Sequence, residues 1–133
     1  MTLNVYLSGE IHTDWREQIT EGASGLDVTF NSPVTDHDAS DDCGVAILGA
    51  EPNKFWHDNK GANIKQWNAA FDAGYAAALG KSLIVMHGPE HQHPLKEVDA
   101  AALAVCEEPR QVVEILNYVL TGKLPEVAIR AAE

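Results

Sequence analysis

The sequence predicts an α/β domain with a mostly parallel sheet. Short apolar, β-rich runs alternate along the 133 residues with segments whose apolar side chains recur at helical spacing. With 45% hydrophobic and 22% charged residues, the composition suits a chain that buries a core and is not typical of a disordered tail. The length corresponds to one domain, which we expect to span residues 1–133.

The N-terminal part of the chain indicates a strand, a helix and a second strand. We expect the first strand over residues 3–8, an apolar run that ends at Gly9. A helix follows from near Thr13, whose side chain can cap it. Its apolar residues recur at helical spacing: Trp15, Ile19 and Ala23. Apolar and polar residues then alternate over residues 26–30, which predicts the second strand.

The rest of the chain continues the alternation. The clearest helical pattern covers residues 64–79, and Gly80 stands where a left-handed C-terminal residue belongs. A continuous apolar run over residues 82–86 predicts a strand that is covered on both faces. We then expect a polar loop over 87–94, a short helix over 95–102, a strand over 103–106 and a long helix that Glu108 and Pro109 open.

The acidic balance of the chain disfavours several classes of partner. Asp and Glu number 20 against 9 Lys and Arg, a formal net charge of −11. Binding to phosphate groups needs clustered basic residues, so we expect neither nucleic acid nor a membrane as partner. No apolar run approaches the roughly 20 residues that span a bilayer, and the N-terminus does not read as a signal peptide. These features predict a cytoplasmic protein.

Three loops are candidates for a ligand site, because ligands of open parallel sheets bind outside the carboxyl ends of the strands. They cover residues 8–13, 32–41 and 87–93. In the first, Gly9 allows close approach of a ligand or simply makes a tight turn, and His12 is either an acid or base or a plain turn residue. Asp72 stands among alanines on a predicted helix, where it is either a solvent-facing residue or a carboxylate that faces the ligand.

Histidines, cysteines and tryptophans each allow a structural interpretation. His87, Glu90, His91 and His93 could bind a metal ion, but neighbouring loop histidines are more often solvated. We therefore expect no metal and no cofactor. Cys43 and Cys106 lie far apart without a metal-ligand spacing, which indicates two free thiols. Trp67 could stack on a planar base or pack in the core.

Four stretches of sequence resemble the YtoQ family, bacterial proteins related to the nucleoside 2-deoxyribosyltransferases. They are Asn4-Val5-Tyr6-Leu7-Ser8-Gly9-Glu10-Ile11-His12, Asp36-His37-Asp38-Ala39-Ser40-Asp41, Trp67 to Lys81 and His93-Pro94-Leu95-Lys96-Glu97. The resemblance implies a three-layer flavodoxin-like, or Rossmann-like, sandwich. It also implies cleavage of an N-glycosidic bond through a covalent sugar intermediate on a carboxylate, and a homo-oligomer that completes its sites across subunits.

The resemblance also implies roles for individual residues. Asp72, two residues before Gly74, falls on the position of the transferases' catalytic glutamate, and Tyr6 falls where a strand tyrosine holds that nucleophile. For a nucleoside-like ligand we expect binding by the following residues: Gly9, Glu10, His12, Asp36, Asp38, Ser40, Trp67 and Asn68. Glu10 or Asp38 could supply the proton that the departing base needs.

Departures from the transferase pattern keep a second function open. Aspartate is one methylene shorter than glutamate, and Gln66 stands where the transferases keep a base-recognising aspartate. The charge of Glu10 would repel a 5′-phosphate. The alternative is therefore a module that binds a nucleoside or nucleotide derivative without chemistry. A scaffold that acts through an oligomer interface on the final helix is a third interpretation.

One stretch of the family pattern is absent from the sequence. YtoQ proteins usually carry a further helix and a Val-rich strand between the positions that match Ile64 and Lys65. That strand would lie beside the first one, in the centre of the sheet. Either this chain has lost a central strand or the segment is missing from the sequence as it stands. We favour the second explanation, because losing the strand would expose an edge on both neighbours.

Overall fold

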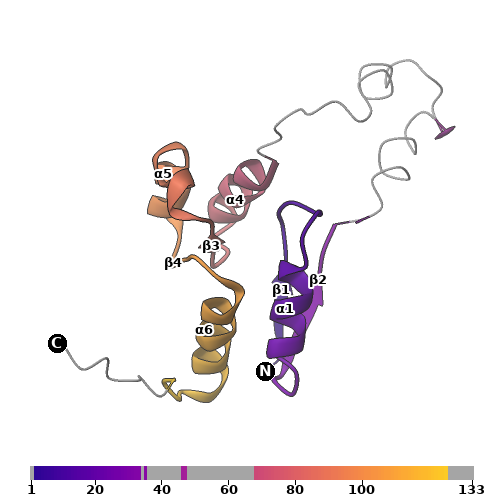
Figure 1. Ribbon diagram of the computed structural model, residues 1–133, viewed down its shortest axis with the longest axis vertical. Coiled ribbons are helices and arrows are strands. Elements are labelled where there is room, and N and C mark those ends of the chain that lie inside the picture. The colour runs from indigo at the N-terminus through magenta and orange to yellow at the C-terminus, as the bar shows by residue number, and fades with distance from the viewer. Residues whose placement is uncertain (1, 34, 36–45, 48–67, 126–133) are drawn as a thin grey trace. The chain divides into compact units, whose positions relative to one another are not determined.

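The computed structural model describes residues 2–33, 35, 46–47 and 68–125 (Figure 1). Their elements belong to one compact unit, residues 1–31 with 68–133, while residues 32–67 form a second unit. The expected single domain stays a prediction. The elements of the first unit are, in order, β1 (Leu3–Tyr6), α1 (Trp15–Gly22), β2 (Val28–Asn31), α4 (Asn68–Ala78), β3 (Ile84–Met86), η1 (Pro89–His91), α5 (Gln92–Ala101), β4 (Ala104–Cys106) and α6 (Pro109–Thr121).

The described strands form two parallel pairs, which confirms the predicted α/β class. β1 pairs with β2 from Leu3 opposite Val28 to Tyr6 opposite Asn31. β3 pairs with β4 from Ile84 opposite Ala104 to Met86 opposite Cys106. Among the described residues the two pairs are not joined by a ladder. The complete three-layer sandwich therefore stays a prediction.

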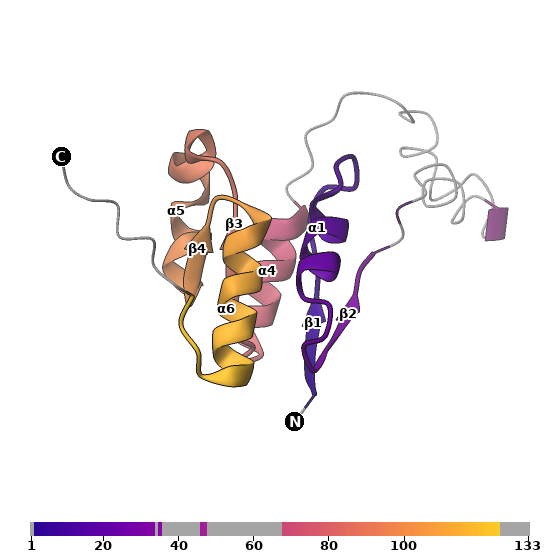
Figure 2. The same cartoon turned by 60° about the horizontal axis from the view of Figure 1, so that its bottom comes forward.

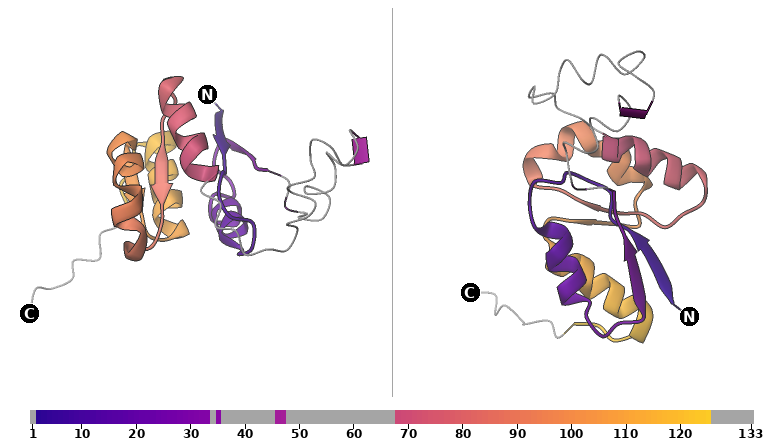
Figure 3. Two further views of the ribbon diagram at one scale, coloured as in Figure 1. Left: turned by 90° about the horizontal axis from the view of Figure 1, so that it is seen from above. Right: turned by 90° about the vertical axis from the view of Figure 1, so that its right-hand side faces the viewer.

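Helices lie on both sides of the β3–β4 pair. α6 lies on one side, and α4 and α5 lie on the other (Figures 1 and 2). α1 and α6 pack against each other (Figure 3, right panel). No helix in the described part of the chain is both long and apolar enough to cross a membrane.

One hydrophobic core links the two strand pairs. Its buried members come from α1, β4, α6 and the residue that follows β1, and partly buried side chains of β1, β2, β3 and the two helices pack against them. The buried members are Leu7, Ile19, Cys106, Val112 and Leu116. Cys106 is a free cysteine buried in this core, which confirms that it packs as a small hydrophobe, and its burial raises the pKa of the thiol. Cys43 lies outside the described residues.

Three helix starts differ in how closely the sequence predicted them. α1 begins at Trp15 after Asp14, and the expected cap at Thr13 is wrong because Thr13 donates both its N–H and its hydroxyl to Glu10. α5 begins at Gln92 rather than at residue 95, so Pro94 lies in its first turn. Proline is tolerated there because the N–H groups of the first turn have no acceptor within the helix. The start of α6 at Pro109 is confirmed.

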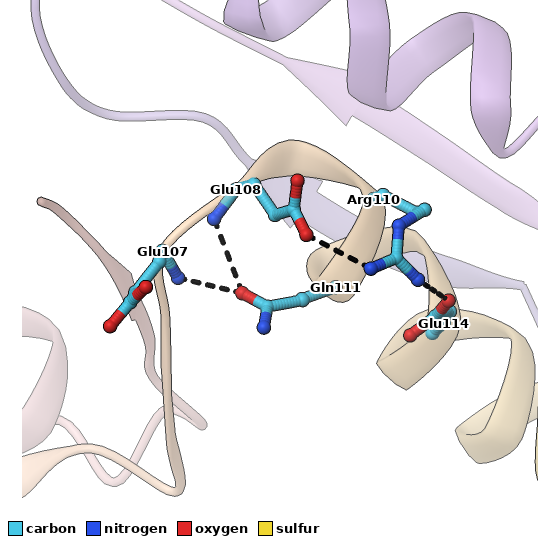
Figure 4. Close-up of polar contacts among 5 residues, drawn as sticks. All are labelled: Glu107, Glu108, Arg110, Gln111 and Glu114. Carbon is cyan, nitrogen blue, oxygen red and sulfur yellow. Dashed lines mark hydrogen bonds and ion pairs between the residues drawn. The ribbon is translucent and has the colours of Figure 1, made fainter. Parts of the chain in front are cut away.

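A reciprocal capping box explains the sharp start of α6. The Gln111 side chain accepts the N–H of Glu107 at 2.7 Å and that of Glu108 at 3.2 Å (Figure 4). The Glu108 side chain in turn accepts the N–H of Gln111. Arg110 bridges Glu108 and Glu114 on the exposed face of the same helix. Gly122 ends the helix in the left-handed conformation, with φ of 71°.

Because no hydrogen bonds join the two strand pairs within the described residues, β1 and β3 each have one edge without a partner strand there. The N–H of Leu7 donates to Asn31 O, and the N–H of His87 donates to Cys106 O. Because N–H groups alternate in direction along a strand, those of Tyr6 and Met86 point away from β2 and β4. These edges are where the strand expected at the 64–65 junction would pair.

We expect the unpaired edges to be visible in hydrogen exchange. The amides of Tyr6 and Met86 should exchange at least about tenfold faster than those of Leu7 and His87, because they lack a ladder acceptor. Residue-resolved exchange by NMR measures both pairs in one sample. Equal protection of all four amides would show that another strand occupies these edges.

Candidate active site

The buried guanidinium of Arg16 shapes the loop between β1 and α1. Its Nε donates to Leu7 O at 3.0 Å, Nη2 to Gly9 O at 2.8 Å and Nη1 to Glu10 O at 2.5 Å. The residue is 6% exposed, and its guanidinium lies 4.3 Å from the centre of the Trp15 ring. The positive charge is thus met by carbonyl dipoles and an aromatic face. Sequence reasoning missed Arg16, although it lies three residues before the core residue Ile19, on the buried side of α1.

Gly9 is required by the indole of Trp15. A Cβ at position 9 would lie 3.0 Å from Trp15 Cζ2, and the glycine φ is 154°. The Trp15 indole N–H also donates to Glu10 O at 3.1 Å. The close approach predicted at Gly9 therefore exists, and the group that makes it is the protein's own tryptophan. Ligand binding at Gly9 stays a prediction.

The Glu10 carboxylate is bound to its own loop. Oε2 accepts the N–H of His12 at 2.5 Å and that of Thr13 at 3.1 Å, and Oε1 accepts the Thr13 hydroxyl. Partial burial works to raise the pKa of Glu10, but these hydrogen bonds to the charged form outweigh it and lower the pKa below its ordinary value. An ionised Glu10 is poorly suited to donate a proton, which disfavours it as the acid for the departing base.

The structure brings Asp72 next to the end of β1. Ser8 Oγ donates to Asp72 Oδ2 at 2.5 Å, joining residues that are 64 positions apart. Asp72 lies in the second turn of α4 and is exposed, whereas Ser8 is half-buried. The sequence predicted Asp72 but missed Ser8, whose place directly after the first strand was the available signal. A carboxylate with one oxygen held and the other open is suited to nucleophilic attack.

The other predicted site residues divide into described and undescribed ones. Tyr6 is 58% exposed, and its expected contact with Asp72 stays a prediction. His12 is exposed at the start of the loop that precedes α1. Asn68 begins α4. The remaining predicted residues lie outside the described part of the chain: Asp36, Asp38, Ser40 and Trp67. Gln66 does too.

The third predicted loop is organised by a histidine–aspartate pair. His87 Nε2 lies 3.0 Å from Asp99 Oδ1, and Nδ1 lies 2.8 Å from Gly88 O. The contact with the Gly88 carbonyl raises the pKa of His87, burial opposes it, and Asp99 and Glu90 raise the pKa further, so the net shift is upward. Beside the pair lies a cavity of about 120 Å³ that is also lined by Glu107.

The geometry of this loop does not favour the metal interpretation. His87 faces Asp99, and His91 Nε2 lies 3.4 Å from Glu90 Oε1. Within the described ranges, no three His, Cys, Asp or Glu side chains gather as ligands for a metal ion. His87 and His91 therefore each lie beside a carboxylate of the protein.

Comparison with known proteins gives a family that this chain matches and a protein that is similar to it. A family described as "Nucleoside 2-deoxyribosyltransferase YtoQ" matches residues 6–65 and 61–120. A protein of Bacillus subtilis (strain 168), named "Uncharacterized protein YtoQ", is 37% identical over 144 aligned positions that cover 90% of this chain and 97% of that protein.

The same comparisons bear on the missing segment. The 144 aligned positions exceed the 133 residues of this chain, so the relative has residues without a counterpart here. The two matched stretches of the family meet at residues 61–65. Both findings support the absence of a family segment at the junction of Ile64 and Lys65. The junction itself lies outside the described residues.

Loss of the Arg16 guanidinium should destabilise the fold. Arg16→Ala leaves three carbonyl groups without their donor, so we expect the free energy of unfolding to fall by roughly 2–4 kcal/mol. The matched control is Arg110→Ala, which removes only exposed ion pairs and should change the free energy of unfolding much less than Arg16→Ala does. Urea denaturation followed by circular dichroism measures both variants. Similar losses of unfolding free energy in the two variants would show that the buried contacts of Arg16 stabilise the fold no more than the exposed ion pairs do.

Proposed function

This chain belongs to the nucleoside 2-deoxyribosyltransferase YtoQ family, and from that premise we propose that it cleaves the N-glycosidic bond of a nucleoside or related ribosyl compound. The nucleophile in this proposal is Asp72. The observation that carries the assignment is the hydrogen bond from Ser8 to Asp72, which places the carboxylate at the carboxyl end of β1. Ligands of parallel sheets bind at this end of the strands.

The proposed reaction uses the open oxygen of Asp72. Oδ1 attacks the anomeric carbon while the bond from that carbon to the base nitrogen breaks, and the electron pair of the bond goes to the base. The base takes up a proton, for which Asp38 is the remaining candidate donor. The product is a sugar ester of Asp72. Water then releases the sugar and a proton, or a second base takes the sugar and completes a transfer.

The loop after β1 favours substrates without a phosphate group. The N–H groups of His12 and Thr13, which precede α1, already donate to the Glu10 carboxylate. Backbone N–H groups of a loop that leads into a helix are groups with which proteins bind anions. Because the protein's own carboxylate occupies them, a 5′-phosphate would meet a negative charge here. We therefore propose that Gly9, Glu10 and His12, together with Asp36, Asp38 and Ser40, bind an uncharged sugar, and that Trp67 and Asn68 contact the base.

A binding module without chemistry is the second candidate. The observation that favours it is the exposure of Asp72, since a covalent nucleophile is usually enclosed. A nucleoside that stabilises the protein against heat, without release of its base, would support the module. At 100 times its Kd a ligand adds about 2.7 kcal/mol to stability, which a thermal-shift measurement detects.

We also propose that the chain forms a homo-oligomer. Three large apolar side chains lie one turn apart along α4: Phe71, Tyr75 and Leu79, which are 76%, 64% and 59% exposed. Side chains four positions apart share one side of a helix, so the three form a continuous apolar stripe. No charged residue besides Asp72 occurs in α4, so two copies of this helix could approach each other closely.

A charge on this stripe should separate the subunits. Leu79→Glu places a carboxylate in the proposed interface, and we expect a smaller species in sedimentation velocity at micromolar concentration. Leu124→Glu is the control, because Leu124 is also exposed but lies after α6. A monomeric wild-type protein would contradict the proposal.

Removal of the Asp72 carboxylate should abolish base release. We expect Asp72→Asn to lower kcat by about a thousandfold or more, because the amide cannot form the sugar ester. Chromatography of a panel of nucleosides and their 5′-phosphates measures the released base. The control is Asp14→Asn, which changes an exposed aspartate that accepts a hydrogen bond from Gln18 and should leave turnover unchanged.

Two results would contradict the proposed function. One is equal turnover by Asp72→Asn and the wild-type protein. The other is turnover of the 5′-phosphates but not of the nucleosides, which would contradict the role given to Glu10. Circular dichroism and the urea midpoint of each variant establish that a loss of turnover is not a loss of folding.

A further inference from the structure

We infer that Ser8 is a positioning residue for Asp72, and this inference rests on the proposed function. Ser8 Oγ lies 2.5 Å from Asp72 Oδ2. Ser8 is half-buried and follows β1, whereas Asp72 is on α4. The hydrogen bond therefore joins the end of a strand to a helix that lies much later in the sequence. Neither composition nor local spacing indicates this pairing.

The backbone on both sides of Ser8 is held in place. The N–H of Leu7 donates to Asn31 O at 2.8 Å, which continues the β1–β2 ladder. The carbonyls of Leu7 and Gly9 accept hydrogen bonds from the buried guanidinium of Arg16. The peptide between Leu7 and Ser8 and the one after Gly9 are thus held by Arg16 of α1, and the peptide before Leu7 is held by β2. A hydroxyl on such a backbone has a defined position, which a positioning residue requires.

The hydrogen bond selects which oxygen of Asp72 can react. With Oδ2 held by Ser8, Oδ1 is the oxygen that meets the anomeric carbon. In the sugar ester formed through Oδ1, Oδ2 becomes the carbonyl oxygen and still accepts the hydroxyl proton of Ser8. Ser8 transfers no proton in this scheme. A misplacement of about 1 Å can cost on the order of a hundredfold in rate, so a fixed rotamer has a large effect.

Ser8 lies two residues after Tyr6, the strand residue that the sequence predicts beside Asp72. Residues at positions i and i+2 of a strand point to the same face, so Tyr6 and Ser8 share one side of β1 and its extension. Tyr6 is 58% exposed, and the described hydrogen bond to the Asp72 side chain comes from Ser8. The alternation of the strand thus places the Ser8 contact on the side of β1 that Tyr6 shares, and a contact of Tyr6 itself with Asp72 stays a prediction.

The test measures kcat and KM for base release in Ser8 variants of the full chain. Ser8→Ala removes the donor, and we expect kcat to fall by about tenfold to a hundredfold while KM changes less than about threefold. Ser8→Thr keeps the hydroxyl and should recover most of kcat. Ser8→Cys, with a thiol that is a weak donor, should lie between them. Ser24→Ala, in an exposed serine after α1, is the control and should match the wild-type protein.

A double variant separates positioning from a general structural effect. In the Asp72→Ala background, Ser8→Ala should cause no further loss of turnover, because the group that Ser8 positions is gone. Wild-type kcat in both Ser8→Ala and Ser8→Cys would overturn the role of Ser8 and leave the proposed function intact. A rise in KM at unchanged kcat would also overturn it. Full activity of Asp72→Ala would instead overturn the proposed function, whatever the Ser8 variants show.

Discussion

The guanidinium of Arg16 is the contact on which the candidate active site depends. It binds the carbonyls of Leu7, Gly9 and Glu10, and so converts the segment between β1 and α1 from a flexible connection into a defined turn. A buried cation is costly unless its donors are satisfied, and here carbonyl oxygens and the Trp15 ring satisfy them. The same contact therefore holds the backbone next to Ser8, whose hydroxyl meets Asp72.

The rest of the turn is satisfied internally as well. Glu10 binds the N–H groups that precede α1, and Trp15 fills the space beside Gly9. Two backbone N–H groups that the loop could offer to a phosphate are therefore already in use. This arrangement distinguishes the loop from an anion site and favours recognition of a sugar through its hydroxyls.

The two strand pairs are held together by side chains rather than by a shared ladder. Leu7 and Ile19 meet Cys106, Val112 and Leu116 in one core. A relative with residues that have no counterpart here, and family matches that meet at residues 61–65, support a family segment that this chain lacks, and its place as a strand between the two pairs stays a prediction. Hydrophobic packing is not directional, so the core can form while the edges of β1 and β3 lack a partner.

The sequence by itself determined the α/β class, the order of the described strands and α-helices and the start of α6 at Pro109, and it singled out Asp72 as a candidate nucleophile. These features are encoded locally, in the period of apolar residues, in capping residues and in a short family pattern. The complete sandwich and the roles of Asp36, Asp38, Ser40 and Trp67 stay predictions.

Only the tertiary structure decided which groups meet. The partners of Arg16 are backbone carbonyls, which are present at every residue and leave no trace in a sequence. Ser8 and Asp72 are 64 positions apart, and nothing in either segment specifies the other. The use of Glu10 as a loop acceptor and of Gly9 as space for an indole likewise depends on how the chain turns. The local sequence pattern predicts helices and strands, whereas the contacts between distant residues arise when those elements pack on one core.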